Sequence, residues 1–254
     1  MNIQPMDNSE LRLPLRSASD LEQAVTALGV LPFFRCGIRG FSVQEMADPS
    51  LWFADDSDGP WEWKGPVIRR GRCAYGKFLR GKAVYMRLDV FSDFLNYRRG
   101  TMEPGRTGVD ALGGLSDCSL LRIIEENGSL LSSGLKNMLG LGTHRRRGPS
   151  DLVDVLGIGG TGGGAKARSA LDAMLSRLQM AGRICIADFE YPVSAAGHKY
   201  GWGLARYTTP EELYGCTIAD AGGRTPVQSR ERLVAIMSSA APAADTRRIH
   251  SFLG

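Results

Sequence analysis

The stretch from residue 165 to residue 208 limits the possible folds more than any other part of the sequence. Four apolar residues repeat at the i, i+3, i+4, i+7 spacing of an amphipathic helix: Leu171, Met174, Leu175 and Leu178. This spacing predicts a helix over 165–181 that Gly182 ends. Two strands of a hairpin are then predicted, separated by a turn-rich segment at 192–199: residues 183–189 (RICIADF) and 200–207 (YGWGLARY).

The opposite face of this helix is small, polar and cationic: Lys166, Ser169, Ala173, Ser176 and Arg177. Two shorter helices are predicted ahead of it. One is capped by Asp117 or Ser119 and stopped by Gly128, and the other carries apolar residues between Leu131 and Leu139. Three helices followed by a hairpin are the order of a winged helix-turn-helix module. The sequence therefore predicts an α+β fold that contains such a module.

The N-terminal part has its own local signals. A helix is expected over 19–28, with Ser19 and Glu22 as a capping box and Gly29 as its C-terminal cap. Residues 48–66 combine turn formers with three tryptophans and are expected to be irregular. Apolar stretches at 73–78 and 83–88 predict a β-hairpin. A short helix is expected around residues 90–95.

Three domains follow from this pattern. A glycine-rich linker at 100–114 divides the chain near residue 112. We expect an N-terminal module at 1–112 with the Trp-rich segment and hairpin, a winged-helix module at 113–216, and a C-terminal tail at 217–254 with a short helix.

Composition excludes several classes of protein. The chain has 254 residues, no apolar window long enough for a membrane span, and no hydrophobic signal core at its start, so a cytoplasmic protein without membrane contact is expected. The 5 cysteines and 3 histidines lack metal-ligand spacing, and no metal or other cofactor is expected. Residues 157–162 match G-x-G-x-x-G, but the chain after them is too short for a dinucleotide domain.

Charge is distributed unevenly. Residues 1–62 hold 4 basic and 10 acidic side chains, whereas residues 63–254 hold 27 and 17. Seven cations and no carboxylate lie between Arg69 and Arg87, and a second cluster is formed by Arg145, Arg146 and Arg147. Such clusters suit a polyanion, although a solvated face paired with the acidic N-terminal part is an equal alternative.

These features predict an interface for double-stranded DNA. A third helix enters the major groove only with small or polar residues on its outward face and cations at its flanks. The expected contacts come from this helix, the preceding arginine loop and the wing: Arg145, Arg146, Arg147, Lys166, Ser169, Ser176, Arg177, His198 and Lys199. The alternative is that the module mediates protein contacts, because every surface helix has a polar face.

The segment Trp61-Glu62-Trp63-Lys64 is a candidate pocket. Trp61 and Trp63 flank an opposite-charge pair and could stack on a base beside Lys64. A packed tryptophan anchor is the alternative.

Several stretches resemble the AlkZ-related proteins, a bacterial winged-helix family akin to the DNA glycosylase that confers azinomycin resistance. The matching pieces are LWF at 51–53, WEWKGP at 61–66, YGKF at 75–78 with RGK at 80–82, RLQM at 177–180, DFEY at 188–191, and YGWG at 200–203 through ARY at 205–207. The resemblance implies tandem winged helix-turn-helix modules with small β-hairpin wings that cradle duplex DNA.

The resemblance leaves the activity open. Glycosylases of the wider group position water with a glutamine–x–glutamine or glutamine–x–aspartate motif early in the chain, and residues 31–36 (LPFFRC) have no glutamine. Glu62 and Gln179 are the candidates for a catalytic role, and excision of alkylated bases remains an alternative to plain DNA binding. A protein-interaction module without catalysis is the third hypothesis.

Overall fold

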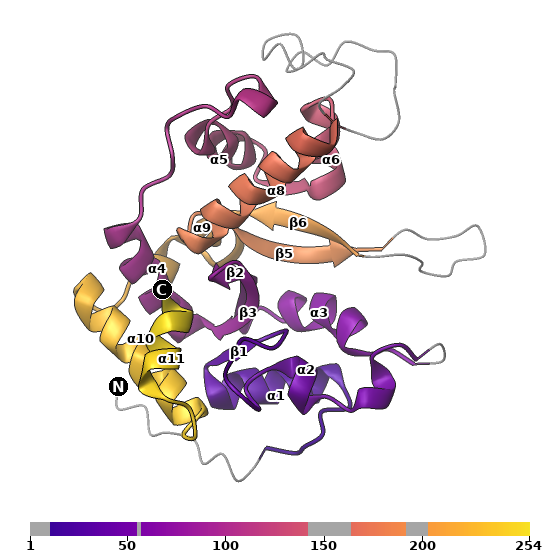
Figure 1. Cartoon of the computed structure of the whole chain (residues 1–254), viewed down its shortest axis with the longest axis vertical. Coiled ribbons are helices and arrows are strands. Elements are labelled where there is room, and N and C mark those ends of the chain that lie inside the picture. The colour runs from indigo at the N-terminus through magenta and orange to yellow at the C-terminus, as the bar shows by residue number, and fades with distance from the viewer. Residues whose placement is uncertain (1–10, 55–56, 142–163, 192–202) are drawn as a thin grey trace.

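The computed structural model describes residues 11–54, 57–141, 164–191 and 203–254. Within them the fold is mixed α/β and contains two antiparallel three-stranded sheets, each surrounded by helices (Figure 1). The α+β expectation is therefore confirmed. Among the described residues, no helix combines the length and apolarity that a membrane crossing requires.

The first sheet is formed by the N-terminal part of the chain. In order, the elements are α1 (Ala18–Leu28), β1 (Val30–Pro32), α2 (Val43–Met46), α3 (Pro60–Arg69), β2 (Cys73–Leu79), β3 (Lys82–Arg87) and α4 (Leu88–Thr101). The sheet order is β1-β3-β2. Successive side chains of β3 alternate between two cores: Val84 and Met86 pack toward α4, and Tyr85 packs toward α1 and α3. Both faces of this sheet are therefore buried.

The second sheet repeats this arrangement. Its elements are α5 (Asp117–Glu126), β4 (Ser129–Leu131), α6 (Ser132–Met138), α8 (Gly164–Met180), β5 (Cys185–Glu190) and β6 (Leu204–Thr208). The sheet order is β4-β6-β5, which is the first order with the strands renumbered. The apolar face of α8 packs against α5 and α6 in one core. Among the described residues, both halves thus run α-helix, strand, α-helix, α-helix and hairpin.

The chain then returns to its first half. After α9 (Pro210–Tyr214), helices α10 (Pro226–Ala240) and α11 (Thr246–Leu253) lie beside α4 (Figure 1). Leu233 and Met237 of α10 join the core of the first sheet. The last two helices therefore cover the first half of the molecule, and the proposed domain boundaries remain a prediction.

Most of the predicted elements are confirmed. The helices expected at 19–28 and 165–181 are α1 and α8, and the hairpin expected at 73–88 is β2 and β3. Gly29 has φ 74° and caps α1 as expected. The N-terminal cap of α1 is Ser17 rather than Ser19, because the Asp20 amide donates to the Ser17 hydroxyl. The helix expected at 90–95 is longer and forms all of α4.

The prediction of an irregular segment over 48–66 is wrong in its last third. Residues 60–69 form α3, with Pro60 in its first turn, where a missing amide hydrogen costs nothing. The Glu62 carboxylate accepts a hydrogen bond from the Gly59 amide at 2.9 Å. Pro66 lies inside the helix. Because proline is common in turns, it made the composition of this segment resemble that of a loop.

Candidate nucleic-acid interface

The outward face of α8 is the best candidate for a nucleic-acid interface. Lys166, Ser169 and Ala173 are exposed on it, while Leu171, Met174 and Leu178 of the opposite face are buried. Asp172 borders this face and lies 3.8 Å from the Lys136 amine of α6. The exposed part of α8 therefore offers Lys166 and two small residues, which can approach another surface closely, with the exposed carboxylate of Asp172 beside them.

Ser176 and Arg177 are engaged by other parts of the protein. The Arg177 guanidinium donates two hydrogen bonds to the buried carboxylate of Asp117, at 2.7 and 2.8 Å. These bonds raise the pKa of Arg177 and tie α8 to the start of α5. The Ser176 hydroxyl donates to the Asp172 carbonyl and lies 3.4 Å from the Lys77 amine of β2. The sequence alone could not indicate these partners, because Asp117 and Lys77 are distant along the chain.

The other predicted contacts lie outside the described residues. These are Arg145, Arg146 and Arg147, together with His198 and Lys199, and the G-x-G-x-x-G match at 157–162 falls there too. Their assignment to a DNA interface stays a prediction.

The tryptophan segment forms an aromatic cluster at the contact between the two halves. Because α3 is a helix, Trp61 and Trp63, two residues apart, lie about 200° from each other around its axis. Trp63 is buried, and its indole donates to the Asp58 carbonyl at 2.9 Å. The Lys64 amine lies 4.6 Å from the centroid of the Trp61 ring, 5.5 Å from that of Phe33 and 4.2 Å from that of Phe189 on β5.

Lys64 is a buried cation held by aromatic faces. Only 6% of the residue is exposed, and no ion pair between described residues includes it. Desolvation lowers the pKa of Lys64 to about 8, while the nearby Glu62 carboxylate raises it. The ring quadrupoles stabilise the charged form in place of a carboxylate. The sequence identified Lys64 as a candidate. It did not identify Phe33 and Phe189, because they are distant from Lys64 along the chain and no short sequence motif links them to it.

Two polar groups beside this cluster have no hydrogen-bond partner among the described residues. They are the Tyr85 hydroxyl and the Trp52 indole nitrogen, and both rings contact Phe33. Burial raises the pKa of Tyr85 well above its ordinary value. Buried polar groups without partners are uncommon and mark this cluster as a second candidate site.

The two candidate catalytic residues have structural partners. Glu62 caps α3 through the Gly59 amide. Gln179 is fully buried; its amide nitrogen donates to the Leu175 carbonyl, and its oxygen accepts from the Lys77 amide, each at 2.9 Å. Gln179 therefore joins α8 to β2 across the two halves.

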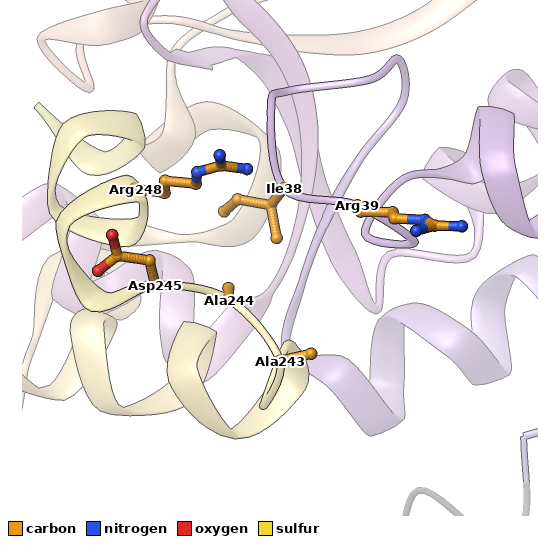
Figure 2. Close-up of a pocket in the computed structure, with 6 residues that line it drawn as sticks. All are labelled: Ile38, Arg39, Ala243, Ala244, Asp245 and Arg248. Carbon is orange, nitrogen blue, oxygen red and sulfur yellow. The ribbon is translucent and has the colours of Figure 1, made fainter.

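A hollow of about 490 Å³ lies between the loop after β1 and the turn from α10 to α11. Figure 2 shows that Arg248 extends toward Ile38, whereas Arg39 extends away from the other lining residues. The Arg248 guanidinium donates to the Gly37 carbonyl at 3.2 Å, and Asp245 adds a carboxylate to the lining. The charges do not converge on one point, so this hollow is not favoured as the functional site.

Among the described residues, fold and site together define a mixed α/β protein whose two halves repeat one order of elements. Its helix α8 presents an exposed face with small residues and Lys166. The family model described as AlkZ related matches residues 15–254, and the chain belongs to that family. Comparison with the curated proteins and with the solved structures found no match.

Proposed function

We propose that this protein binds double-stranded DNA through tandem winged-helix modules, with α8 as the helix that enters the major groove. The observation that carries the proposal is the exposed face of α8. Ser169 lies at its centre, opposite the apolar stripe, and Lys166 and Ala173 lie beside it. Small side chains allow close approach to base edges, and the lysine supplies a phosphate contact.

The two halves contribute differently to this proposal. In the first half, α3 occupies the position that α8 has in the second. Each of these helices packs against a strand of the other half, α3 against β5 and α8 against β2, but α3 is buried or half-buried along almost its whole length. The Arg69 guanidinium of α3 pairs with Asp188 at 2.7 Å, and the Tyr191 hydroxyl donates to the Trp61 carbonyl. The first half therefore supports the second, and α8 is the helix proposed to contact DNA.

Substitution at the centre of the exposed face tests this function. In Ser169→Glu a carboxylate replaces a hydroxyl where the helix would meet the groove, and we expect duplex affinity to fall by about tenfold or more. Arg122→Ala on α5 is the control, because it also lowers the net charge by one and removes only an exposed pair with Glu126. Equal affinities of Ser169→Glu and the control for a fluorescent duplex would refute the role of α8.

Excision of an alkylated base is a second candidate, favoured by the cluster around Lys64. A perturbed amine beside two buried polar groups without partners is typical of a reactive site. We expect an alkylated duplex treated with the protein and then with hot alkali to break at abasic sites, and Lys64→Met to lose that cleavage. Unbroken duplex across a panel of alkylated bases would remove this candidate.

A further inference from the structure

The fold divides the basic cluster at 69–87 into paired and unpaired cations. Four of its seven members form ion pairs with carboxylates: Arg69 with Asp188, Arg70 and Arg72 with Glu22, and Arg87 with Asp89. Glu22 belongs to the acidic N-terminal part, so this part of the chain neutralises Arg70 and Arg72. These four arginines have structural partners within the protein.

The three remaining cations all lie on the hairpin of β2 and β3. Lys77, Arg80 and Lys82 are exposed, and none of them forms an ion pair with another described residue. Three positive charges within six residues, without a carboxylate between them, create a local attraction for anions.

The backbone conformation at the turn of this hairpin does not favour an arginine at position 80. Arg80 has φ 49° and Gly81 has φ 70°, the left-handed conformations of a two-residue hairpin turn. Asparagine or glycine adopts the first position at lower conformational cost than arginine. A long cation at this position places its charge at the tip of the hairpin.

The hairpin is fixed to the end of α8. The Lys77 amide donates to the Gln179 oxygen at 2.9 Å, and the Lys77 amine lies 3.4 Å from the Ser176 hydroxyl. Ser176 is one turn along α8 from Ala173, so the exposed face of α8 ends where the hairpin begins. Through this contact with β2, the hairpin extends the exposed face of α8.

We propose that Lys77, Arg80 and Lys82 form a second anchor that binds the phosphate backbone of the duplex. This inference rests on the proposed DNA-binding function and extends its footprint from the second half of the molecule to the first. The ligand chemistry is that of phosphate diesters, which lysine and arginine contact without reading sequence. The hairpin therefore adds affinity and salt dependence, and it adds no base preference.

The test compares two triple variants of the full chain in duplex binding at several salt concentrations. The first is Lys77→Ala, Arg80→Gly, Lys82→Ala, in which glycine suits the left-handed position. The second is the charge-matched control Arg106→Ala, Arg122→Ala, Arg247→Ala, which removes exposed cations elsewhere. Thermal unfolding checks that both variants fold.

Each phosphate contact contributes about 0.9 to the slope of log affinity against log salt. We expect the hairpin variant to lose about 2 to 3 from this slope, and the control to keep the slope of the wild type. Equal slopes for the hairpin variant and a wild type that binds would overturn the anchor and leave the proposed function intact. A wild type that does not bind duplex would overturn both.

Discussion

Asp93 shows how single buried charges hold this fold together. Its carboxylate is fully buried on α4 and accepts hydrogen bonds from Arg224 at 2.6 Å, from Ser229 at 2.8 Å, and from Arg232. Arg232 also pairs with Asp89. Burial raises the pKa of Asp89, but the hydrogen bonds from Arg87 and Arg232 outweigh it and hold this pKa below its ordinary value. The network fastens α10 to α4 at a point where water is excluded.

Asp93→Ala is expected to lower the free energy of unfolding by about 3 kcal/mol or more, because the arginines lose their buried partner. Glu126→Ala, which removes a pair exposed on α5, is expected to change it by less than about 0.5 kcal/mol. Urea denaturation measures both values. A loss below about 1 kcal/mol for Asp93→Ala would contradict the structural role.

Lys64 gives a prediction about pH. Its folded pKa of about 8 lies below the ordinary value of 10.5, so between these values the unfolded chain binds more protons than the folded one. Stability therefore gains a contribution as pH rises through this window, by at most about 1.4 kcal/mol per pH unit. Below pH 8 the cost of burying the charge is fully present.

Lys64→Met removes the titrating group while it keeps most of the volume. We expect the difference in unfolding free energy, wild type minus variant, to increase from pH 8 to pH 10. Other groups titrate equally in both proteins and cancel in this difference. A difference that stays constant over that range would show that Lys64 keeps an ordinary pKa.

At the scale of elements, regular periodicity was predictable and long-range contacts were not. The spacing of Leu171, Met174, Leu175 and Leu178 determines α8, and paired apolar stretches determine the β2 and β3 hairpin. α3 was missed because Pro60, Pro66 and the glycines around Trp61 resemble a turn-rich loop. Its helix is stabilised by tertiary packing of Trp63, Val67 and Ile68, which no local pattern reports.

In the candidate site, too, local features were predictable from the sequence and long-range contacts were not. Lys166 and Ser169 were predicted from helical periodicity, and both are exposed. The pairing of Arg177 with Asp117 depends on how α5 packs against α8, and the neighbourhood of Lys64 depends on β5. Information of this kind lies in the tertiary structure.

The entry into α3 gives a prediction at this scale. A Cβ at Gly59 would lie 1.8 Å from the Leu51 carbonyl oxygen, so Gly59→Ala is expected to cost about 1 to 3 kcal/mol or more. Gly134 in α6 is the matched control, since its Cβ would meet no atom within 4 Å. Gly134→Ala is expected to be stabilising by about 0.5 to 1 kcal/mol. Similar unfolding midpoints for the two variants would argue against the tight turn before α3.

At the scale of the whole molecule, the two halves are joined by contacts of several kinds. Arg69 pairs with Asp188, Gln179 accepts from Lys77, and Phe189 contacts Tyr75 edge to face with ring centroids 5.8 Å apart. We expect one cooperative thermal transition, with equal calorimetric and van't Hoff enthalpies. Two separate transitions in the wild type would show that the halves fold independently.

The central claim is that this protein binds duplex DNA through phosphate contacts made by the α8 face and the elements beside it. The most direct measurement is the affinity of the wild type for a plain fluorescent duplex across a series of salt concentrations. With about four to six phosphates neutralised, the slope of log affinity against log salt is expected to be about −3.6 to −5.4. A flat dependence, or no binding at low salt, would contradict the claim.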